Sequence, residues 1–360
     1  MPDLSREQHP VDVAVVGGGQ SGLAAGFYLR RAGLEPGTGY VILDAAEQPG
    51  GAWPLMWPSL RTFSPTQYSS LPGWMMPPWT GDDGYPPASH VAAYLRDYER
   101  RYDLPVLRPT RVRDVRRARE RLRVETDRGD WSARHVISAT GTWSRPFVPR
   151  YPGVGSFRGK QLHAAQYRCA DEVAGKRVVV VGGGNSAAQI LAEVSTVADT
   201  VWVAQRPPRF LPDDVDGHAL FMIATARRRQ IDSGKADGEG VAGLGDIVMV
   251  PSVRDARDRG VLRAEPMFTR LTPSGVAWPD REVEADVVLW CTGFRAALSH
   301  LAPLGLRDRE GRIATDGTRA LREPRLHLLG YGDWTGSASA TLIGVGRTAK
   351  EAVAEIVAEL

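Results

Sequence analysis

The sequence contains little cysteine and little excess charge. Its 360 residues include only two cysteines, Cys169 and Cys291, which lie far apart and show no C-x-x-C spacing. This scarcity excludes a disulfide framework, a zinc site and a protein dithiol motif, and we expect no bound metal. The 45 basic and 42 acidic residues are mixed along the chain and leave a net charge of only +3, so nucleic acid is not an expected partner.

Long apolar runs are also missing. No stretch approaches the length of a membrane span, and residues 1–10 are polar, without the apolar segment of a signal peptide. We therefore expect a cytoplasmic protein with no membrane partner. The composition, with 42% hydrophobic and 24% charged residues, 39 glycines and 26 prolines, is typical of a loop-rich globular α/β protein. A chain of this length is longer than a single hydrophobic core usually supports, so we expect two domains.

Residues 11–29 predict a strand, a glycine-rich turn and a helix. Gly17, Gly19 and Gly22 satisfy G-x-G-x-x-G, whose glycines permit a tight turn, close approach of a pyrophosphate and close packing of the helix on the strand. The next apolar run ends in Asp44, where a carboxylate can accept hydrogen bonds from a ribose. Because strand, turn, helix and acid occur together, we interpret this segment as a dinucleotide site rather than a purely structural turn.

A second glycine-rich turn follows in residues 176–194. Here Gly182, Gly184 and Ala187 give G-x-G-x-x-A between an apolar strand and a helix, which predicts a second dinucleotide site. The contacts expected from this turn are Gly182, Gly184, Asn185 and Ser186.

The strand after the second turn ends in basic and neutral residues instead of an acid. Gln205 and Arg206 close it, and Arg209 lies nearby. An acid would favour the free 2′-hydroxyl of NAD, whereas a guanidinium suits the 2′-phosphate of NADP, so this site favours NADPH. Gln205 can tolerate either coenzyme. The alternative, that Arg206 and Arg209 are solvated loop charges, stays open.

Near the C-terminus, residues 324–344 combine an apolar strand, Gly332-Asp333 and the start of a helix. This arrangement resembles the motif that binds the flavin ribityl chain in two-dinucleotide flavoproteins, and the helix N-terminus would stabilise negative charge on a reduced flavin. Two further strands that end in small residues, 135–142 with Gly141 and 287–294, resemble the crossing points between the two domains of such proteins.

These features predict an α/β fold with two Rossmann-like dinucleotide-binding domains, the second inserted in the first. Residues 1–154 and 285–360 are expected to form the FAD domain, and residues 155–284 the NAD(P)H domain. A helix over residues 89–102 is expected to begin at a Ser89 cap. Residues 111–141 predict a meander of strands with water-facing arginines, and residues 227–245 predict a mobile surface loop.

The stretch FRGKQLHAAQY, residues 157–167, places Phe157, Gly159, His163 and Tyr167 in the pattern F-x-G-x-x-x-H-x-x-x-Y, between the two glycine-rich turns. The sequence thereby resembles the class B flavoprotein monooxygenases, which include the flavin-containing and Baeyer-Villiger types. Its compactness is similar to the short bacterial flavin-containing monooxygenases and to flavoproteins of arsenic-resistance operons.

The resemblance implies an enzyme that uses FAD, NADPH or NADH, and O₂. In that family a C4a-(hydro)peroxyflavin passes one oxygen atom to a soft nucleophile or a ketone. The site is kept dry, because water would let the peroxyflavin decay to hydrogen peroxide. Sulfoxidation is the leading expectation, with Baeyer-Villiger or N-oxidation beside it, and a homodimer is common among similar proteins. A thiol or disulfide reductase, or an electron-transfer flavoprotein without an oxygenation substrate, remains the alternative.

Further site residues follow from the same resemblance. Residues 50–53, GGAW, match a Gly-Gly-x-Trp that follows the first ribose-binding acid in that family, and residues 51–79 are rich in tryptophan and proline, as expected of rigid loops that form an apolar wall. Larger members carry Thr-Asn where this sequence has Thr62-Phe63, followed by Ser64. The expected contacts of the flavin are Gly17, Gly19, Gln20, Ser21, Gly22, Asp44, Gly51, Trp53, Gly141, Gly332 and Asp333, and the expected residues of the reacting centre are Phe63, Ser64 and His163. His163 is expected to couple domain motion to closure rather than to transfer protons, and a buried histidine that satisfies linker backbone is nearly the same prediction.

Overall fold

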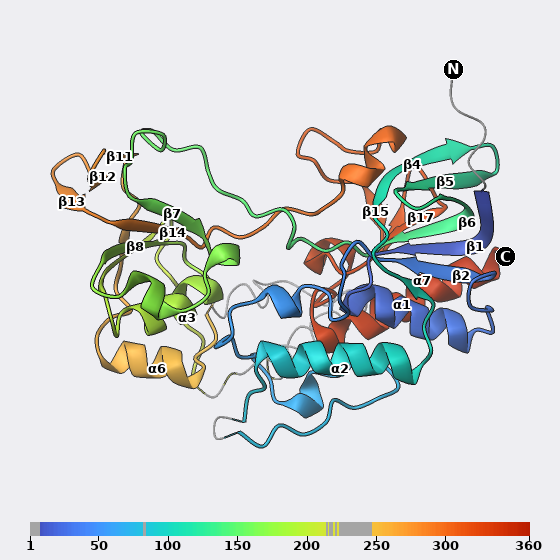
Figure 1. Ribbon diagram of the computed structural model, residues 1–360, viewed down its shortest axis with the longest axis horizontal. Coiled ribbons are helices and arrows are strands. Elements are labelled where there is room, and N and C mark those ends of the chain that lie inside the picture. The colour runs from blue at the N-terminus through green and yellow to red at the C-terminus, as the bar shows by residue number, and fades with distance from the viewer. Residues whose placement is uncertain (1–7, 82–83, 214, 216–218, 220–221, 223–246) are drawn as a thin grey trace, which may run out of the picture.

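In the computed structural model, a mixed nine-stranded sheet and a parallel five-stranded sheet lie at opposite ends of an elongated molecule (Figure 1). The structure describes residues 8–81, 84–213, 215, 219, 222 and 247–360. The surface loop predicted over residues 227–245 lies outside the described residues. Among the helices that are described, none combines the length and the apolar character needed to cross a membrane.

The first sheet has nine strands, and its path runs β15-β16-β17-β6-β1-β2-β3, with β5 joining β4 to β6. Its centre is parallel, from β17 through β6, β1 and β2 to β3. Crossovers through α1 (Gln20–Arg31) and α2 (Ala88–Arg101) connect β1 to β2 and β2 to β3. The strands are β1 (Gln8–Val16), β2 (Tyr40–Leu43), β3 (Val106–Leu107), β4 (Val112–Ala118), β5 (Arg121–Thr126), β6 (Asp130–Ser138), β15 (Thr315–Asp316), β16 (Arg319–Ala320) and β17 (Leu326–Leu328).

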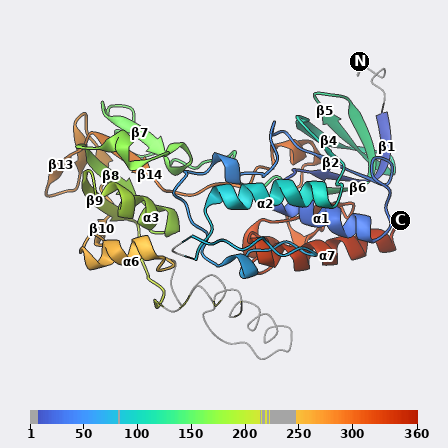
Figure 2. The same cartoon turned by 60° about the horizontal axis from the view of Figure 1, so that its bottom comes forward.

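Three helices cover one face of this sheet, α1 (Gln20–Arg31), α2 (Ala88–Arg101) and α7 (Leu342–Ala358) (Figure 2). Their apolar sides share a core with β1 and β2 that includes Leu23, Tyr94 and Val345. The opposite face packs under the β4-β5-β6 meander and the 3₁₀ turn η5 (Ser299–Leu304). Helix α2 is capped by Pro87 instead of the expected Ser89, which lies inside its first turn.

The arginine-rich segment forms the expected meander. Strands β4, β5 and β6 pair antiparallel, with a turn at residues 127–129, and Arg113 and Arg116 are exposed. The tryptophan-rich segment contains only two short 3₁₀ turns, η1 (Trp53–Leu55) and η2 (Thr66–Tyr68), because its prolines cannot donate the hydrogen bonds of a longer helix.

The second sheet is parallel, in the order β10-β9-β8-β14-β7, with α3 (Asn185–Val194) and α6 (Pro251–Asp258) packed together beside it. A small antiparallel sheet, β11-β12-β13, lies at its outer end (Figure 1). The strands of these two sheets are β7 (Lys160–His163), β8 (Arg177–Val181), β9 (Asp199–Ala204), β10 (Ala264–Pro266), β11 (Arg270–Leu271), β12 (Gly275–Ala277), β13 (Glu282–Glu284) and β14 (Val287–Trp290). The 3₁₀ turns η3 (Ala164–Gln166) and η4 (Ala170–Val173) follow β7. A further 3₁₀ turn, η6 (Gly332–Thr335), follows β17 of the first sheet.

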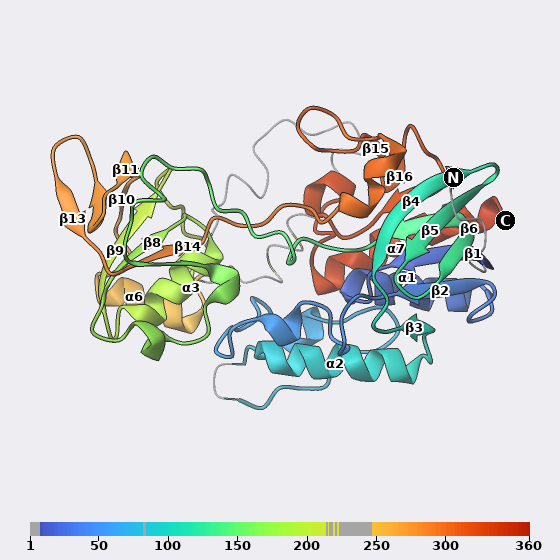
Figure 3. The same ribbon diagram turned by 45° about the horizontal axis from the view of Figure 1, so that its top comes forward.

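Two connections run between the sheets, and Figure 3 shows them side by side. They pair antiparallel, since the Phe147 amide donates to the Gly293 carbonyl and the Arg295 amide donates to the Arg145 carbonyl. The fold is therefore the predicted one, a dinucleotide-binding domain inserted in another. The expected first boundary, residue 154, falls in the first connection. Strand β14 belongs to the second sheet, so we propose that the chain returns to the first domain after Trp290 rather than at residue 285.

Candidate functional site

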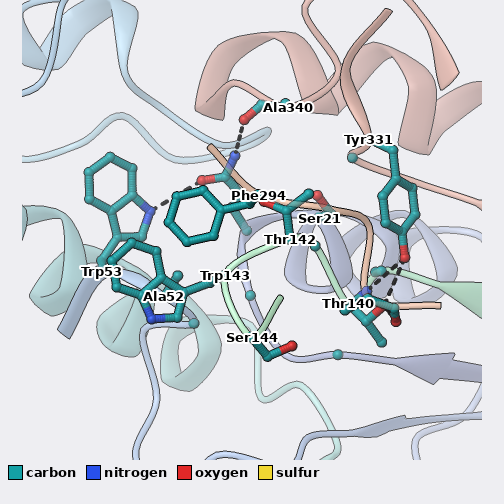
Figure 4. Close-up of a pocket in the computed structure, with 18 of the residues that line it drawn as sticks. Ser21, Ala52, Trp53, Thr140, Thr142, Trp143, Ser144, Phe294, Tyr331 and Ala340 are labelled. Carbon is teal, nitrogen blue, oxygen red and sulfur yellow. Dashed lines mark hydrogen bonds between the residues drawn. The ribbon is translucent and has the colours of Figure 1, made fainter. Parts of the chain in front are cut away.

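A cavity of about 1440 Å³ opens where the parallel strands of the first sheet end. Its walls include Val16 at the end of β1, Leu43 at the end of β2, Ala139 just after β6, and Tyr331 after β17. Figure 4 shows part of this wall. Ligands of open α/β sheets bind at this edge, where loops and helix N-termini converge.

The first glycine-rich turn forms the floor of this cavity. Gly17 has φ +107°, and a Cβ atom there would lie 2.5 Å from the Ala139 carbonyl oxygen. A Cβ atom on Gly22 would lie only 1.8 Å from the Gly17 carbonyl oxygen, so the helix can approach the turn only with glycine here. Helix α1 follows at Gln20 with no acidic residue in its first turn. A helix N-terminus that follows a glycine-rich turn is a favourable place for an anion, because free backbone amides and the helix dipole point to it.

A chain of hydrogen bonds joins three segments at this floor. The Trp53 indole donates to the Gln20 side-chain oxygen at 3.2 Å, and the Gln20 side-chain nitrogen donates to the Ala340 carbonyl at 2.8 Å (Figure 4). Gly51 lies against Gly19, and the buried Ser21 lies against Gly330. The tryptophan-rich loops and the approach to α7 are thereby held around the N-terminus of α1.

Asp44 lies where sequence reasoning placed it, directly after β2 and on the cavity wall. Its carboxylate is paired with Arg108, whose Nε lies 2.7 Å from Oδ2. Arg108 also contacts Glu99 of α2, at 2.6 Å. Burial lowers the pKa of Arg108, but hydrogen bonds and charges from Glu99 and Asp44 outweigh it and raise the pKa overall.

The C-terminal motif supplies the wall opposite. Gly332 and Asp333 line the cavity within the turn η6, and the Ser339 hydroxyl donates to the Gly332 carbonyl at 2.8 Å. Helix α7 then begins after Thr341, whose side chain accepts from the Gly344 amide. The N-termini of α1 and α7 therefore both meet this cavity, and neither first turn contains an acid.

A polar network forms part of the same wall. The Tyr331 hydroxyl is 2.8 Å from the Thr140 hydroxyl (Figure 4). It is also 3.0 Å from Ser138 Oγ, which is 3.2 Å from His300 Nε2. Burial lowers the pKa of His300 to about 4, so this imidazole is neutral at pH 7. The network ties the end of β6 to the start of η5 beside Gly141, which also lines the cavity.

Aromatic side chains form the end of the cavity nearest the second domain. The Trp143 and Phe294 rings, one from each connection, stack with centroids 5.1 Å apart. Phe63 and Ser64 also line this region, and the hydroxyls of Thr62 and Ser69 both donate to the Ser64 carbonyl, at 2.7 and 3.1 Å. These two hydrogen bonds fix the backbone of the loop that carries Phe63.

The same loops are fastened to the second domain. Trp57 packs edge-on against Tyr167, with ring centroids 6.1 Å apart. The carboxylate of Glu193 accepts from the Tyr167 hydroxyl at 2.9 Å and from the Ser59 hydroxyl at 2.6 Å. Burial, with the Glu193 charge, raises the pKa of Tyr167 and keeps its proton in place. The last residue of the sequence pattern thus joins the two domains.

The second glycine-rich turn lies apart from the large cavity. Gly182 has φ +139°, and a Cβ atom there would lie 2.3 Å from the Cys291 carbonyl oxygen. Gln205, Arg206 and Arg209 follow β9 and are exposed. The Asn185 side-chain oxygen accepts from the Val248 amide at 2.8 Å, so it fastens a neighbouring segment to the turn.

Comparison with known proteins assigns the family. The family described as pyridine nucleotide-disulphide oxidoreductase matches residues 14–236. The solved structure of a flavin-containing monooxygenase from Stenotrophomonas maltophilia is 52% identical, with a TM-score of 0.88, over 98% of this chain and 99% of that chain. The chain belongs to the flavin-containing monooxygenases. This confirms the resemblance found in the sequence, the fold class and the activity class.

Two further relatives match this chain at lower identity. A protein of Geobacillus kaustophilus named as an uncharacterized CzcO-like oxidoreductase is 27% identical over 353 residues, 97% of this chain and 99% of its own length. A Baeyer-Villiger monooxygenase of Streptomyces coelicolor is 35% identical over 221 residues, which cover 60% of this chain and 42% of that protein. The shared region is thus longer than a single glycine-rich turn.

The predicted site residues of the monooxygenase fall into three groups. The large cavity is lined by Gly17, Gly19, Gln20, Ser21, Asp44, Gly51, Trp53, Phe63, Ser64, Gly141, Ser186, Gly332 and Asp333. The second turn with Gly182, Gly184, Asn185, Gln205, Arg206 and Arg209 lies beyond it, and Ser186 connects the two regions. Gly22 packs behind the first turn, and His163 lies behind Phe294, with ring centroids 5.0 Å apart, instead of lining the cavity.

Sequence reasoning missed Arg108, Tyr331 and His300. Tyr331 lies within the C-terminal motif of residues 324–344, but the pattern does not single it out. Arg108 and His300 stand in no recognisable motif, and their partners Asp44 and Ser138 lie 64 and 162 positions away in the sequence. One signal was available for Arg108. It directly follows a short apolar run, and residues that follow two adjacent parallel strands lie next to each other. The pairing of β2 with β3 realises this arrangement.

Proposed function

We propose that this FAD-dependent monooxygenase uses NADPH, and also NADH, with O₂ to oxygenate small uncharged soft nucleophiles and ketones, with thioethers as the preferred substrates. One observation carries the proposal: a single cavity joins a diphosphate-binding turn, two helix N-termini and an aromatic wall, and it reaches Ser186 of the second turn. Both the flavin and its substrate therefore have a place in one continuous space.

The residues present fit FAD. The glycine-rich turn leaves no room for side chains where the diphosphate would lie, and Asp44 offers a carboxylate oxygen for the adenosine ribose. Asp333 and the N-terminus of α7 would hold the ribityl chain and stabilise negative charge on the ring system. When bound, FAD accepts hydride and activates oxygen; the chain positions it and excludes water.

The second turn is the proposed site of the coenzyme. Gly182 and Gly184 would admit the diphosphate, and the exposed Arg206 and Arg209 offer guanidinium groups to a 2′-phosphate. Gln205 has no charge and tolerates a free 2′-hydroxyl, which supports the use of NADH as well. The nicotinamide would reach the large cavity past Ser186.

The character of the cavity disfavours a cationic substrate. Among the described lining residues the only carboxylates are Asp44 and Asp333, both assigned to FAD, so a cationic substrate finds no counter-charge at the aromatic end. Trp53, Trp143 and Phe294 offer apolar surface there instead. In this environment a neutral sulfur or carbonyl group is desolvated at little cost.

The connections explain how such a site can stay dry. His163 donates from Nε2 to the Gly293 carbonyl at 3.0 Å and accepts at Nδ1 from the Ala165 amide at 3.0 Å. Burial lowers the pKa of this imidazole, which favours the neutral form that these two hydrogen bonds require. With both nitrogens engaged, His163 holds a linker and moves no proton, which supports its role as a coupler.

One assay separates the proposal from its rivals. Purified protein, loaded with FAD, is mixed with NADPH, oxygen and methyl p-tolyl sulfide, and sulfoxide, hydrogen peroxide and loss of added disulfide are measured together. Sulfoxide formation matched to NADPH use supports oxygenation. Peroxide alone across sulfides, ketones and amines would reject it in favour of electron transfer, and disulfide loss would favour a reductase.

A homodimer and a cytoplasmic location also belong to the proposal, and they rest on the sequence alone.

A further inference from the structure

Arg108 joins three elements around the first glycine-rich turn. Its Nε lies 2.7 Å from Asp44 Oδ2, its Nη1 lies 2.6 Å from Glu99 Oε1, and its Nη2 lies 3.4 Å from the Gly18 carbonyl oxygen. One guanidinium thus contacts the residue after β2, the helix α2 and the turn itself. The side chains of Arg108 and Asp44 are only 10% and 12% exposed, so water screens this pair weakly.

The packing leaves this guanidinium little freedom. A Cβ atom on Gly18 would lie 2.7 Å from Arg108 Nη2 and 2.7 Å from Asp44 Oδ2, so the ion pair fills the space beside the turn. The amide of Thr110 donates to the Asp44 carbonyl at 2.7 Å and holds the chain after Arg108 next to Asp44. The planar fork of arginine meets two carboxylates in different directions, which the single ammonium of lysine cannot do with the same geometry.

The charges around the turn also need a cation. Asp44 and Glu99 are two carboxylates on one guanidinium, and Glu99 Oε2 is buried without a hydrogen-bond partner. FAD would bring the negative charge of its diphosphate to the same turn. Without Arg108, two uncompensated carboxylates would face that charge, and Asp44 would lose the contact that fixes its rotamer.

We propose that Arg108 is a positioning residue for the adenosine half of FAD. It holds Oδ2 of Asp44, which leaves Oδ1, with only a long hydrogen bond of 3.4 Å from the Ala46 amide, to accept from the ribose. It also offsets the negative charge of Asp44 and Glu99 beside the diphosphate. This inference rests on the proposed assignment of the first glycine-rich turn to FAD. Asp44 makes the contact with the cofactor, and Arg108 acts through Asp44.

The test is a double-mutant cycle on FAD affinity. Apoprotein is titrated with FAD, and binding is followed by quenching of flavin fluorescence, for the wild type, Arg108→Gln, Asp44→Asn and the double variant. Arg108→Gln should raise the Kd about 10- to 100-fold, the range for loss of a charged hydrogen bond. In the Asp44→Asn background the same substitution should change the Kd less than about threefold, because the residue through which it acts is already altered.

Two further variants protect the interpretation. Arg100→Gln removes an exposed arginine that pairs with Asp97 one turn away on α2. Its Kd for FAD should match that of the wild type. Arg108→Lys keeps the positive charge but loses the planar guanidinium. Urea unfolding of the apoprotein shows whether Arg108→Gln folds. If it does not, Arg108→Lys carries the test: it should raise the Kd for FAD about threefold or more when Asp44 is present and change it less in the Asp44→Asn background.

The outcomes separate the two claims. Wild-type protein that binds no FAD would reject the assignment of the first turn, and this inference with it. Tight wild-type binding, with an unchanged Kd for the Arg108 variants or an equal loss in both Asp44 backgrounds, would leave the assignment intact and overturn the positioning role.

Discussion

The Nε2 atom of His163 donates to the carbonyl oxygen of Gly293 at 3.0 Å, and the same oxygen accepts the Phe147 amide at 3.0 Å. One carbonyl therefore joins the end of β7 to both connections between the domains. The relationship gives a physical meaning to the histidine of the sequence pattern, since it ties strand β7 to the paired connections between the domains.

Loss of this contact should uncouple NADPH use from oxygenation. In His163→Ala the connections are no longer tied to β7, so water reaches the site more often and hydrogen peroxide should rise roughly twofold or more relative to sulfoxide. Flavin content should stay unchanged, because His163 lies outside the cavity wall. His90→Ala is the matched control, since His90 contacts the Pro77 carbonyl, which belongs to neither connection. An unchanged ratio of peroxide to sulfoxide in His163→Ala would contradict this role.

The first glycine-rich turn should not tolerate a side chain. In Gly17→Ala the added Cβ would lie 2.5 Å from the Ala139 carbonyl oxygen at a φ of +107°, and Asp44→Ala removes the proposed ribose contact. Both proteins should purify without the yellow colour of the wild type. The measurement is the ratio of flavin to protein absorbance, and a stoichiometric flavin content in both variants would place the flavin elsewhere.

Much of this site could be predicted from local sequence. The strands and helices around Gly17 and Gly182 form as their patterns indicate, because each glycine-rich turn, its strand and its helix are contiguous in the chain. The Arg108–Asp44 pair and the Tyr331–Ser138 contact could not be foreseen, since they depend on which strands become neighbours. The Ser89 cap was wrong because the extended Pro87 stands at the N-cap position, two residues before Ser89, so that Ser89 lies inside the helix.

Arg206 should distinguish the two coenzymes. Arg206→Ala is expected to raise the KM for NADPH about 10-fold while the KM for NADH changes little, because only NADPH carries the phosphate that a guanidinium can bind. Initial rates of coenzyme oxidation at saturating sulfide provide the measurement. Equal changes for both coenzymes would show that Arg206 does not contact the 2′-phosphate.

Acid should destabilise the fold through its buried histidines. Burial lowers the pKa of His300 from 6.5 to about 4, so the unfolded chain binds this proton first as the pH falls. The stabilisation is complete above pH 6.5 and is lost as the pH drops toward 4, by at most about 3 kcal/mol at 1.36 kcal/mol per unit of pKa. The free energy of unfolding, measured with urea across this pH range, should fall less steeply in His300→Asn than in the wild type or in His90→Asn. The same dependence on pH in all three proteins would contradict the role of His300.

The most direct test of the account follows the oxygen atom itself. The FAD-loaded enzyme is supplied with NADPH, methyl p-tolyl sulfide and isotopically heavy dioxygen in ordinary water, and the sulfoxide is analysed by mass spectrometry. The account predicts one heavy oxygen atom in nearly every sulfoxide molecule and one NADPH consumed for each. Sulfoxide that carries oxygen from water, or NADPH oxidation that yields only hydrogen peroxide, would contradict it.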